Sequence, residues 1–197
     1  MRESDLDPNP LRQFETWFEA AREAGIRLPE AMALATATAD GSSSARMVLL
    51  KGVDERGFVF HTSYESQKGR QLAETGRAAL LFYWDPLGRQ VRIEGEVAKI
   101  SAEESDAYFR TRPAATRVSA WASPQSEVIP SREALDARAA ELAARWAGQE
   151  VPRPPFWGGY RLAPATIEFW EHRDDRLHDR LRYRREGEGW VVERLGP

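Results

Sequence analysis

Short runs of alternating apolar and polar residues dominate the chain, and they predict antiparallel strands. Alternation is the pattern of an extended strand, whose successive side chains lie on opposite faces. Turn sequences such as Asp40-Gly41, 54–57 and Asp85-Pro86-Leu87-Gly88 separate the runs. The predicted strands cover about residues 31–38, 44–51, 57–62, 78–84, 89–100, 157–163, 166–171, 176–185 and 190–194.

Helical spacing interrupts this pattern at four places. Each predicted helix has its own start or stop signal: Asn9-Pro10 suit an N-cap and first turn, Ser101 with Glu104 forms a capping box, and Ser131 suits an N-cap. Gly76 and Gly148 are the expected stops of two of them. The predicted helices extend from Pro10 up to Gly25, around 67–75, from Ser101 to before Pro113, and from Ser131 to about 147. The small, polar stretch 114–123 is assigned to no element.

Many short strands with interleaved helices predict an α+β fold with an antiparallel, barrel-like sheet. No glycine-rich dinucleotide motif follows a strand, and we interpret Gly158-Gly159, after the Pro-rich stretch 151–155, as a bend. The length of 197 residues suits one domain, 1–197, with the N-terminal helix and the helical segment 101–147 packed around the sheet.

Composition excludes several classes of protein. The net charge is −3 and the pI about 5.8, so no overall basic field attracts nucleic acid or an anionic membrane. The absence of cysteine rules out disulfides and thiolate chemistry, and three scattered histidines make a metal site improbable. The polar N-terminus and the lack of a long apolar stretch lead us to expect a cytoplasmic protein without a membrane segment.

Candidate chemistry gathers in the basic run 176–180. On an extended strand, Arg176, His178 and Arg180 would share one face, while Leu177 and Leu181 would pack on the other. Such a face suits a phosphate or carboxylate, because arginine keeps its proton and presents a fixed fork of donors. The alternative is a solvated strand edge, bridged by the nearby carboxylates Asp174, Asp175 and Asp179.

A second basic strand covers 46–51. Alternation places Arg46 with Val48 and Leu50, and Lys51 with Met47 and Leu49, so the two charges are expected to point in opposite directions. One strand could therefore serve two anions. Lys68, close to Thr62 and Ser66 at a predicted helix start, adds a cation and two hydroxyls suited to a phosphate.

These residues belong to a series of motifs that resembles the pyridoxamine phosphate oxidase family. The motifs occur in the order found in that family: Arg-x-Val-Leu-Leu-Lys at 46–51, Ser-x-Lys at 66–68, Gly-Arg-Gln-Val at 88–91, Tyr-Phe-x-x-Arg-Pro at 108–113, Gln-Ser at 125–126, Phe-Trp-Gly-Gly at 156–159 and Arg-Leu-His-Asp-Arg at 176–180. The resemblance implies an FMN-binding split barrel that forms a homodimer with shared active sites. It also implies oxidation of pyridoxamine or pyridoxine 5'-phosphate by oxygen to pyridoxal 5'-phosphate, with release of hydrogen peroxide.

The resemblance also implies the site residues. The set matched to FMN binding is Arg46, Met47, Val48, Leu49, Leu50, Lys51, His61, Thr62, Ser66, Gln67, Lys68, Gln90, Gln125, Ser126, Trp170 and Arg180. The set matched to the substrate is Lys51, Tyr108, Arg112, Thr116, Arg176, Leu177 and His178, of which Arg176 and His178 would hold the reacting end against the flavin.

Several positions depart from the family pattern. His61 occupies a position where tyrosine is common, and Thr116 replaces a serine. The N-terminal arm has only Arg2 as a basic residue, whereas some members of the family cover the substrate with a basic arm, so closure over the substrate stays an open question. Two alternatives remain open: a related FMN oxidase of secondary metabolism, of the phenazine-pathway type, and a non-catalytic binder of flavin or pyridoxal phosphate. Lys51 distinguishes the first, because a substrate without phosphate would not need this lysine together with Tyr108 and Arg112.

Overall fold

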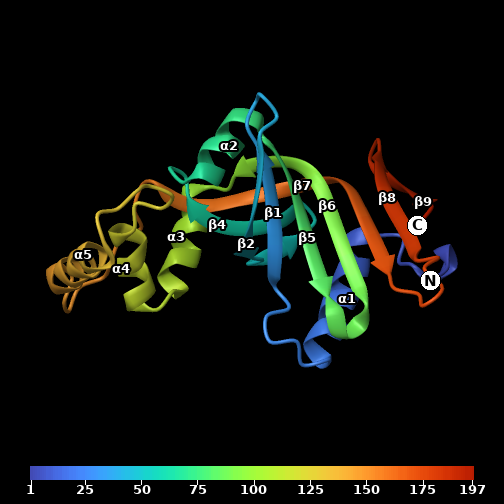
Figure 1. The fold of residues 1–197 in the computed structure, drawn as a ribbon, viewed down its shortest axis with the longest axis horizontal. Helices are drawn as coiled ribbons and strands as arrows, with labels where there is room; N and C mark the ends of the chain where they lie inside the picture. The colour runs from blue at the N-terminus through green and yellow to red at the C-terminus, as the bar shows by residue number, and fades with distance from the viewer.

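Nine antiparallel strands form one curled sheet in the computed structural model, which describes residues 1–197 (Figure 1). The strands are β1 (Ala31–Ala37), β2 (Ser43–Leu49), β3 (Gly52–Asp54), β4 (Gly57–Ser63), β5 (Arg77–Trp84), β6 (Arg89–Lys99), β7 (Trp157–Glu171), β8 (Asp179–Glu186) and β9 (Gly189–Arg194). The order is β2-β1-β5-β6-β7-β4-β3, with β8 added to β7 and β9 to β8. This half-barrel and its flanking helices confirm the predicted split-barrel fold.

The long strand β7 organises the sheet. β6 pairs along one side of it, while β4 and β8 share the other side at its two ends. The prediction of separate strands at 157–163 and 166–171 is therefore wrong. Pro164, which cannot donate a backbone hydrogen bond, lies between the β4-paired and β8-paired parts of β7, where that edge needs no donor.

Gly158 and Gly159 also lie inside β7 and do not form a bend. They pair in register with Thr62 and His61 of β4. A Cβ atom on Gly158 would lie 2.0 Å from the Tyr64 hydroxyl. Glycine is therefore needed at this position to leave room for the Tyr64 side chain.

The five α-helices are α1 (Pro10–Glu23), α2 (Gln67–Thr75), α3 (Ala102–Thr111), α4 (Ala114–Ala122) and α5 (Arg132–Arg145). The predicted caps are present: the side chains of Asn9, Ser101 and Ser131 each accept a backbone N–H of the first turn. Ser66, at the predicted start of α2, caps that helix in the same way. The stretch that was assigned to no element forms α4, because Pro113 ends α3 only to start a new helix in another direction.

The core lies between α1 and one face of the sheet. Phe14 of α1 packs edge-on against Phe58 at 4.9 Å, and Trp17 packs edge-on against Phe169 at 5.1 Å. All four side chains are at most 5% exposed. This burial fixes α1 beneath the sheet and leaves the opposite face and the two ends free for other contacts.

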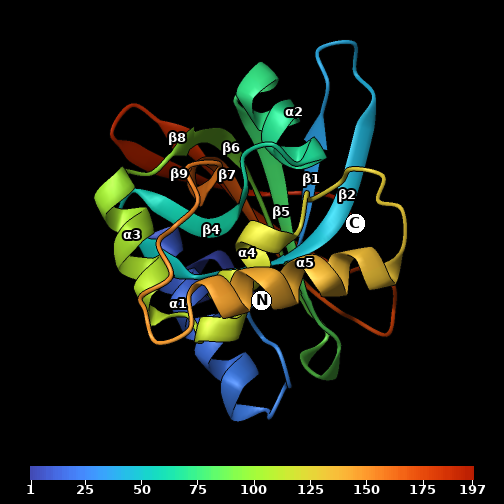
Figure 2. The same cartoon turned by 90° about the vertical axis from the view of Figure 1, so that its left-hand side faces the viewer.

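The two ends of the molecule differ. α4 and α5 lie at one end, and β8, β9 and both chain termini lie at the other, with β7 running between them (Figures 1 and 2). None of the helices has the length and apolar character needed to cross a lipid bilayer.

The basic run 176–180 differs from its prediction. β8 begins only at Asp179, and residues 176–178 belong to the preceding turn. Arg176 has a positive φ of 66°, which interrupts the alternation. Leu177 is 64% exposed and does not pack against the sheet, whereas Leu181 is fully buried as expected.

Candidate functional site

A basic pocket of about 370 Å³ opens between β2, β4, α2 and α3. Four of its lining residues are cations, and none is a carboxylate; the lining comprises Arg46, Met47, Val48, Leu49, Lys51, His61, Thr62, Lys68, Tyr108, Arg112, Gln125 and Trp157. Eleven of these twelve were predicted from widely separated motifs, nine as flavin-binding residues and Tyr108 and Arg112 as substrate-binding residues, and the curl of the sheet brings them together. Positive charge without acidic partners makes this pocket suited to anions.

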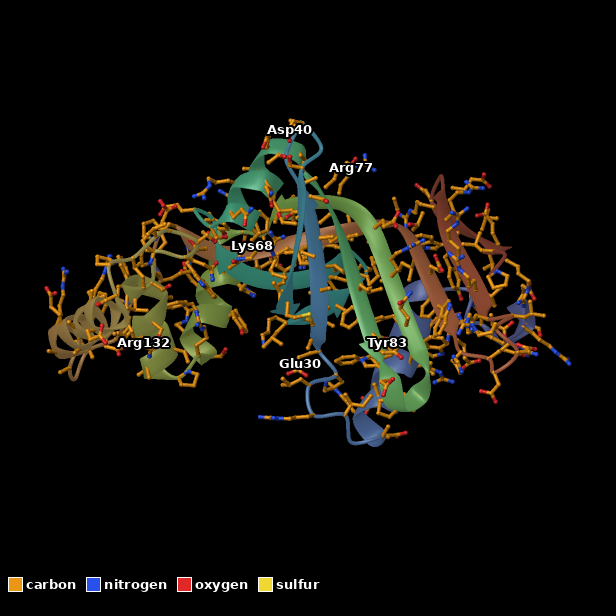
Figure 3. The ribbon with its side chains drawn as sticks, viewed as in Figure 1. Glu30, Asp40, Lys68, Arg77, Tyr83 and Arg132 are labelled. Atoms are coloured by element: carbon orange, nitrogen blue, oxygen red, sulfur yellow. The ribbon has the colours of Figure 1, made fainter.

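Lys68, labelled in Figure 3, is the one buried cation among the four that line this pocket. It is only 8% exposed, and its Nζ contacts the oxygens of Gln125 at 3.1 Å, Thr62 at 3.3 Å and Ser66 at 3.4 Å. All three partners are neutral. Burial and the nearby charge of Arg46 lower the pKa of the Lys68 ammonium, as expected for a buried cation without a counter-ion.

Arg46 reaches the same pocket from β2. Its guanidinium donates to the carbonyl oxygens of Leu34 and Ser44 and to the side chains of Thr36 and Gln71. These acceptors are also neutral, so they orient the group without neutralising it, and burial lowers its pKa. Together with Lys68 and the start of α2 at Ser66, Arg46 provides donors that fit the phosphate of FMN.

Lys51 borders the pocket as well. β2 ends at Leu49, so alternation no longer fixes the direction of residue 51, and both cations of the 46–51 motif line one cavity. The structure thus offers two cationic parts of a single pocket, one around Lys68 and Arg46 and one around Lys51 and Arg112.

Three aromatic rings lie in layers beside Arg112. The imidazole of His61 stacks on Tyr108 at 3.9 Å and faces Trp157 at 5.3 Å, with interplanar angles of 20° and 16°. Both nitrogens of His61 are buried and without a hydrogen-bond partner. Burial, reinforced by Arg112 and Lys51, lowers the pKa of His61 to about 4, so the ring is neutral at pH 7.

Thr116 lies apart from this group. α3 ends at Thr111, and the chain bends at Arg112 and Pro113 before α4, so Tyr108, Arg112 and Thr116 do not share a continuous helix face. The Thr116 hydroxyl donates to the carbonyl oxygen of Pro113 at 2.8 Å and is exposed. Gln67 and Ser126 are exposed too, while Leu50 is buried in the core.

The remaining predicted flavin residues form a row across three strands at the other end of β7. Gln90 pairs with Trp170, and Trp170 pairs with Arg180, so their side chains lie on one face of β6, β7 and β8. Arg180 already has a carboxylate partner, since its Nε donates to the buried Glu168 at 2.8 Å.

The turn with Arg176 and His178 lies beside this row. The Nδ1 atom of His178 accepts the backbone N–H of Arg173 at 3.1 Å, which leaves Nε2 of a neutral ring as the donor, and the ring lies 4.7 Å from Trp170. Asp175 stabilises the turn, because it binds the side chain of Arg173 and accepts the N–H of Leu177. None of the three carboxylates near the run bridges its basic side chains. Asp174 and Asp175 pair with residues before the run, His172 and Arg173, and Asp179 binds Arg194 and the N-terminal amine.

One chain does not bring the two groups of residues together. Trp157 opens β7 and Trp170 lies near its end, a separation of up to about 40 Å along an extended strand. Figure 1 shows β7 running from the helical end to β8. The basic pocket and the Gln90-Trp170-Arg180 row are therefore parts of one site only if a second copy of the chain contributes one of them.

Sequence reasoning missed Trp157 and Gln71. Trp157 appeared only as a member of the 156–159 motif, and Gln71 contacts Arg46 and accepts the Thr36 hydroxyl at 2.6 Å.

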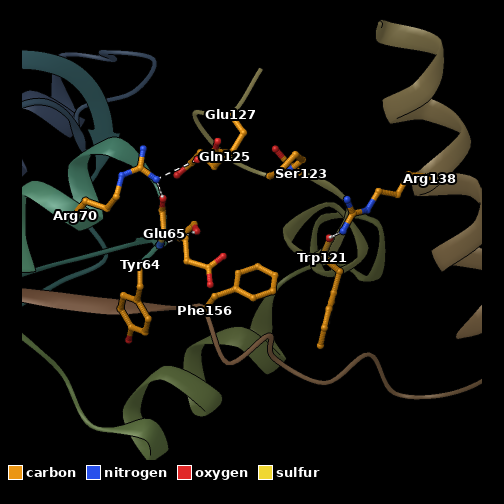
Figure 4. Close-up of a pocket in the computed structure, with 11 residues that line it drawn as sticks. Tyr64, Glu65, Arg70, Trp121, Ser123, Gln125, Glu127, Arg138 and Phe156 are labelled. Atoms are coloured by element: carbon orange, nitrogen blue, oxygen red, sulfur yellow. Dashed lines mark hydrogen bonds and ion pairs between the residues drawn. The ribbon is translucent and has the colours of Figure 1, made fainter. Parts of the chain in front are cut away.

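A second cavity of about 500 Å³ adjoins the basic pocket at Gln125 and is lined by Tyr64, Arg70, Trp121 and Phe156, among others (Figure 4). Here Arg70 is paired with Glu127 at 3.0 Å, so its charge is already compensated.

Comparison with known proteins places the chain in a family. Residues 18–146 match the pyridoxamine 5'-phosphate oxidase family, and residues 157–197 match the pyridoxine 5'-phosphate oxidase C-terminal dimerisation region. A pyridoxine/pyridoxamine 5'-phosphate oxidase of Rubrobacter xylanophilus is 59% identical over all of this chain and 91% of the relative, and one of Paraburkholderia phymatum is 60% identical over 98% and 92%.

Comparison with solved structures supports the same family. PhzG from Burkholderia lata 383, in complex with tetrahydrophenazine-1-carboxylic acid, superposes with a TM-score of 0.94 at 42% identity and covers 98% of this chain and 95% of its own. A pyridoxamine 5'-phosphate oxidase-related, FMN-binding protein from Nostoc punctiforme shares the fold, with a TM-score of 0.76 at 19% identity over 98% and 100% of the two chains. The chain belongs to the pyridoxamine 5'-phosphate oxidase family.

Proposed function

We propose that this protein is an FMN-dependent oxidase that converts pyridoxamine 5'-phosphate or pyridoxine 5'-phosphate to pyridoxal 5'-phosphate. The observation that carries the proposal is the basic pocket, in which Lys68 is buried without a counter-ion and no carboxylate is present. A buried, uncompensated cation is costly unless an anion completes the site. Relatives of nearly 60% identity that carry this activity in their names support the same conclusion.

The donors of the pocket divide between two phosphates. Arg46, Lys68, Thr62, Ser66 and Gln125 would hold the phosphate of FMN, and Lys51, Tyr108 and Arg112 would hold that of the substrate. The cationic groups make charge-assisted bonds, and their neutral neighbours keep them oriented. FMN, when bound, would supply the redox chemistry, that is, an acceptor for a hydride equivalent from the carbon that bears the amine or hydroxyl group.

The protein's own contribution is orientation. Arg176 and His178 would contact the pyridine ring and place the reacting carbon against the flavin, with His178 donating from Nε2. No side chain needs to act as a nucleophile, and exclusion of water falls to the aromatic walls formed by Tyr108 and Trp157. We assign Gln90, Trp170 and Arg180 to the flavin of the partner subunit, which makes the homodimer a condition for a complete site.

A phenazine-type oxidase is the second candidate, and the similarity to PhzG favours it. The ligand in that structure is a carboxylic acid, whereas the present pocket carries the pair Lys51 and Arg112 that a phosphate would use. We therefore prefer the phosphorylated substrate. A non-catalytic binder would have the same pocket but would consume no oxygen.

Peroxide release from pyridoxamine 5'-phosphate tests the proposal. FMN-loaded protein should produce hydrogen peroxide and pyridoxal 5'-phosphate in equal amounts, and pyridoxamine without phosphate should react far more slowly. Turnover of tetrahydrophenazine-1-carboxylic acid in place of the phosphate ester would favour the second candidate. Binding without any peroxide would contradict both. Oxygen as the acceptor and a cytoplasmic location belong to the same proposal.

A further inference from the structure

The guanidinium of Arg112 is held in an unusual way for a cation of a binding pocket. Its Cζ lies 4.6 Å from the centre of the Trp157 ring and 5.5 Å from that of Phe109. No ion pair with a carboxylate is present, and its Nη1 is buried without a hydrogen-bond partner. The group is therefore fixed by aromatic faces and keeps free donors.

This arrangement has a chemical consequence. A carboxylate would also fix the guanidinium, but it would occupy the same N–H fork that a phosphate needs and would cancel the charge. An aromatic face attracts the cation through its quadrupole and leaves the in-plane N–H groups available. Trp157 thus offers support to Arg112 without competing for its ligand.

The position of Trp157 is itself fixed. It is 8% exposed, it begins β7, and its ring packs edge-on against Phe109 at 5.1 Å. It also faces the neutral imidazole of His61, which stacks in turn on Tyr108. The rings therefore link the first residues of β7 to the two substrate-phosphate candidates of α3 and its C-terminal end.

We propose that Trp157 is a positioning residue for the substrate phosphate. Its ring face holds the guanidinium of Arg112 and aligns it with Tyr108. The inference rests on the proposed function, because it describes how the same site holds its phosphorylated ligand. It predicts that the ring face matters, and that the size of the side chain alone does not suffice.

Three variants separate this role from simple packing. Trp157→Leu removes the ring face, and Trp157→Phe keeps one. Trp146→Leu is the matched control, since it removes another tryptophan with an arginine above it, Arg145 at 5.6 Å. Trp146 lies at the end of α5 and does not line the basic pocket. Calorimetric titration of FMN-loaded protein with pyridoxal 5'-phosphate gives the dissociation constant without turnover, and steady-state oxidation of pyridoxamine 5'-phosphate gives KM and kcat.

We expect Trp157→Leu to raise the dissociation constant and KM by at least about tenfold, the effect of losing one charge-assisted contact. FMN content should be retained, and kcat should fall by less than KM rises. Trp157→Phe should recover most of the affinity, and Trp146→Leu should resemble wild type. An unchanged dissociation constant in Trp157→Leu, or an equal loss in Trp157→Phe, would overturn the inference.

Two further points keep the test decisive. If Trp157→Leu does not fold, as judged by thermal unfolding, Trp157→Met takes its place, because its longer and more flexible side chain adapts better to the space of the indole but still lacks a ring face. If wild-type protein binds pyridoxal 5'-phosphate but releases no peroxide, the proposed function fails, while the comparison of dissociation constants still decides the role of Trp157.

Discussion

The ammonium of Lys68 lies 3.1 Å from the side-chain oxygen of Gln125, and this contact joins α2 to the segment that follows α4. Both residues are expected to face the FMN phosphate. The bond is between a cation and a neutral amide, so the charge of Lys68 remains available to an anion.

Replacing Lys68 by methionine should have opposite effects on the empty and the loaded protein. Without flavin, the variant should be at least as stable as wild type, because a buried and uncompensated charge is removed. Its affinity for FMN should fall by about tenfold or more, since a charge-assisted contact contributes roughly 1.5–3 kcal/mol. Urea unfolding of flavin-free protein and fluorescence titration with FMN measure the two effects. Lys99→Met, at an exposed lysine above the Tyr64 ring, is the control. Wild-type protein that bound riboflavin as tightly as FMN would contradict the phosphate assignment.

A mixing experiment tests the shared site. The Arg112→Ala and Arg176→Gly variants should each be nearly inactive, because each lacks one half of the site. If the halves come from different subunits, a heterodimer of the two variants contains one intact site. Random reassociation should then restore about a quarter of wild-type activity, because half of the dimers are mixed and each has one intact site of two. Recovery near zero in dimers shown to be mixed would place both residues in the same subunit's site.

Arg112→Ala and Lys51→Ala should affect the substrate and leave the flavin in place. Loss of one charged contact to the phosphate should raise KM for pyridoxamine 5'-phosphate by roughly ten- to a hundredfold. FMN content, read from the absorbance of the purified protein, should stay near wild type. A variant that lost FMN but kept its KM would show that the two phosphates are assigned the wrong way round.

Arg176 provides a clean test because of its backbone. Its φ of 66° suits glycine, so Arg176→Gly removes the guanidinium without straining the turn. We expect kcat/KM for pyridoxamine 5'-phosphate to fall by about a hundredfold or more, since misplacement at a reacting centre has effects of that size. Arg176→Lys should recover little, because an ammonium lacks the planar fork. Anaerobic stopped-flow reduction of bound FMN isolates this step, and Arg185→Ala removes an exposed arginine of β8 as control. A near-normal rate of FMN reduction in Arg176→Gly would show that Arg176 does not orient the substrate, and the interpretation of the run 176–180 as solvated surface would stand.

His61 predicts a loss of stability in acid. Its pKa is about 4 in the folded protein, against 6.5 for an ordinary imidazole. Between these values the unfolded chain binds the additional proton, so the free energy of unfolding falls as the pH drops from 6.5 to 4. The loss should reach about 2 kcal/mol, given roughly 1.4 kcal/mol per pKa unit and some solvent screening. Urea unfolding at pH 7 and pH 4.5 should show a smaller difference for His61→Phe than for wild type. The control variant His172→Gln, at an exposed histidine, should show the same difference in unfolding free energy between the two pH values as wild type. An equal difference in wild type and His61→Phe would contradict this role.

Local sequence determined the elements and most of their ends. The N-caps at Asn9, Ser66, Ser101 and Ser131 are present because capping depends on a side chain and the backbone within three residues of it. Alternation likewise gave β2, where Arg46 and Val48 are partly buried and Met47 and Leu49 exposed. The motif order also indicated the family and the curled antiparallel sheet.

Tertiary structure decided what depends on partners far away in the chain. Periodicity favoured a strand through 176–178, but the contacts of Asp175 and the positive φ of Arg176 make a turn there. A break was expected in β7 at Pro164, where the change of partner from β4 to β8 allows the strand to continue. Arg180 is paired with Glu168, whereas Lys68 stays without a counter-ion, and no local pattern distinguishes the two. Charge compensation and the division of the site between the ends of β7 arise from packing and register, and residue type alone does not fix them.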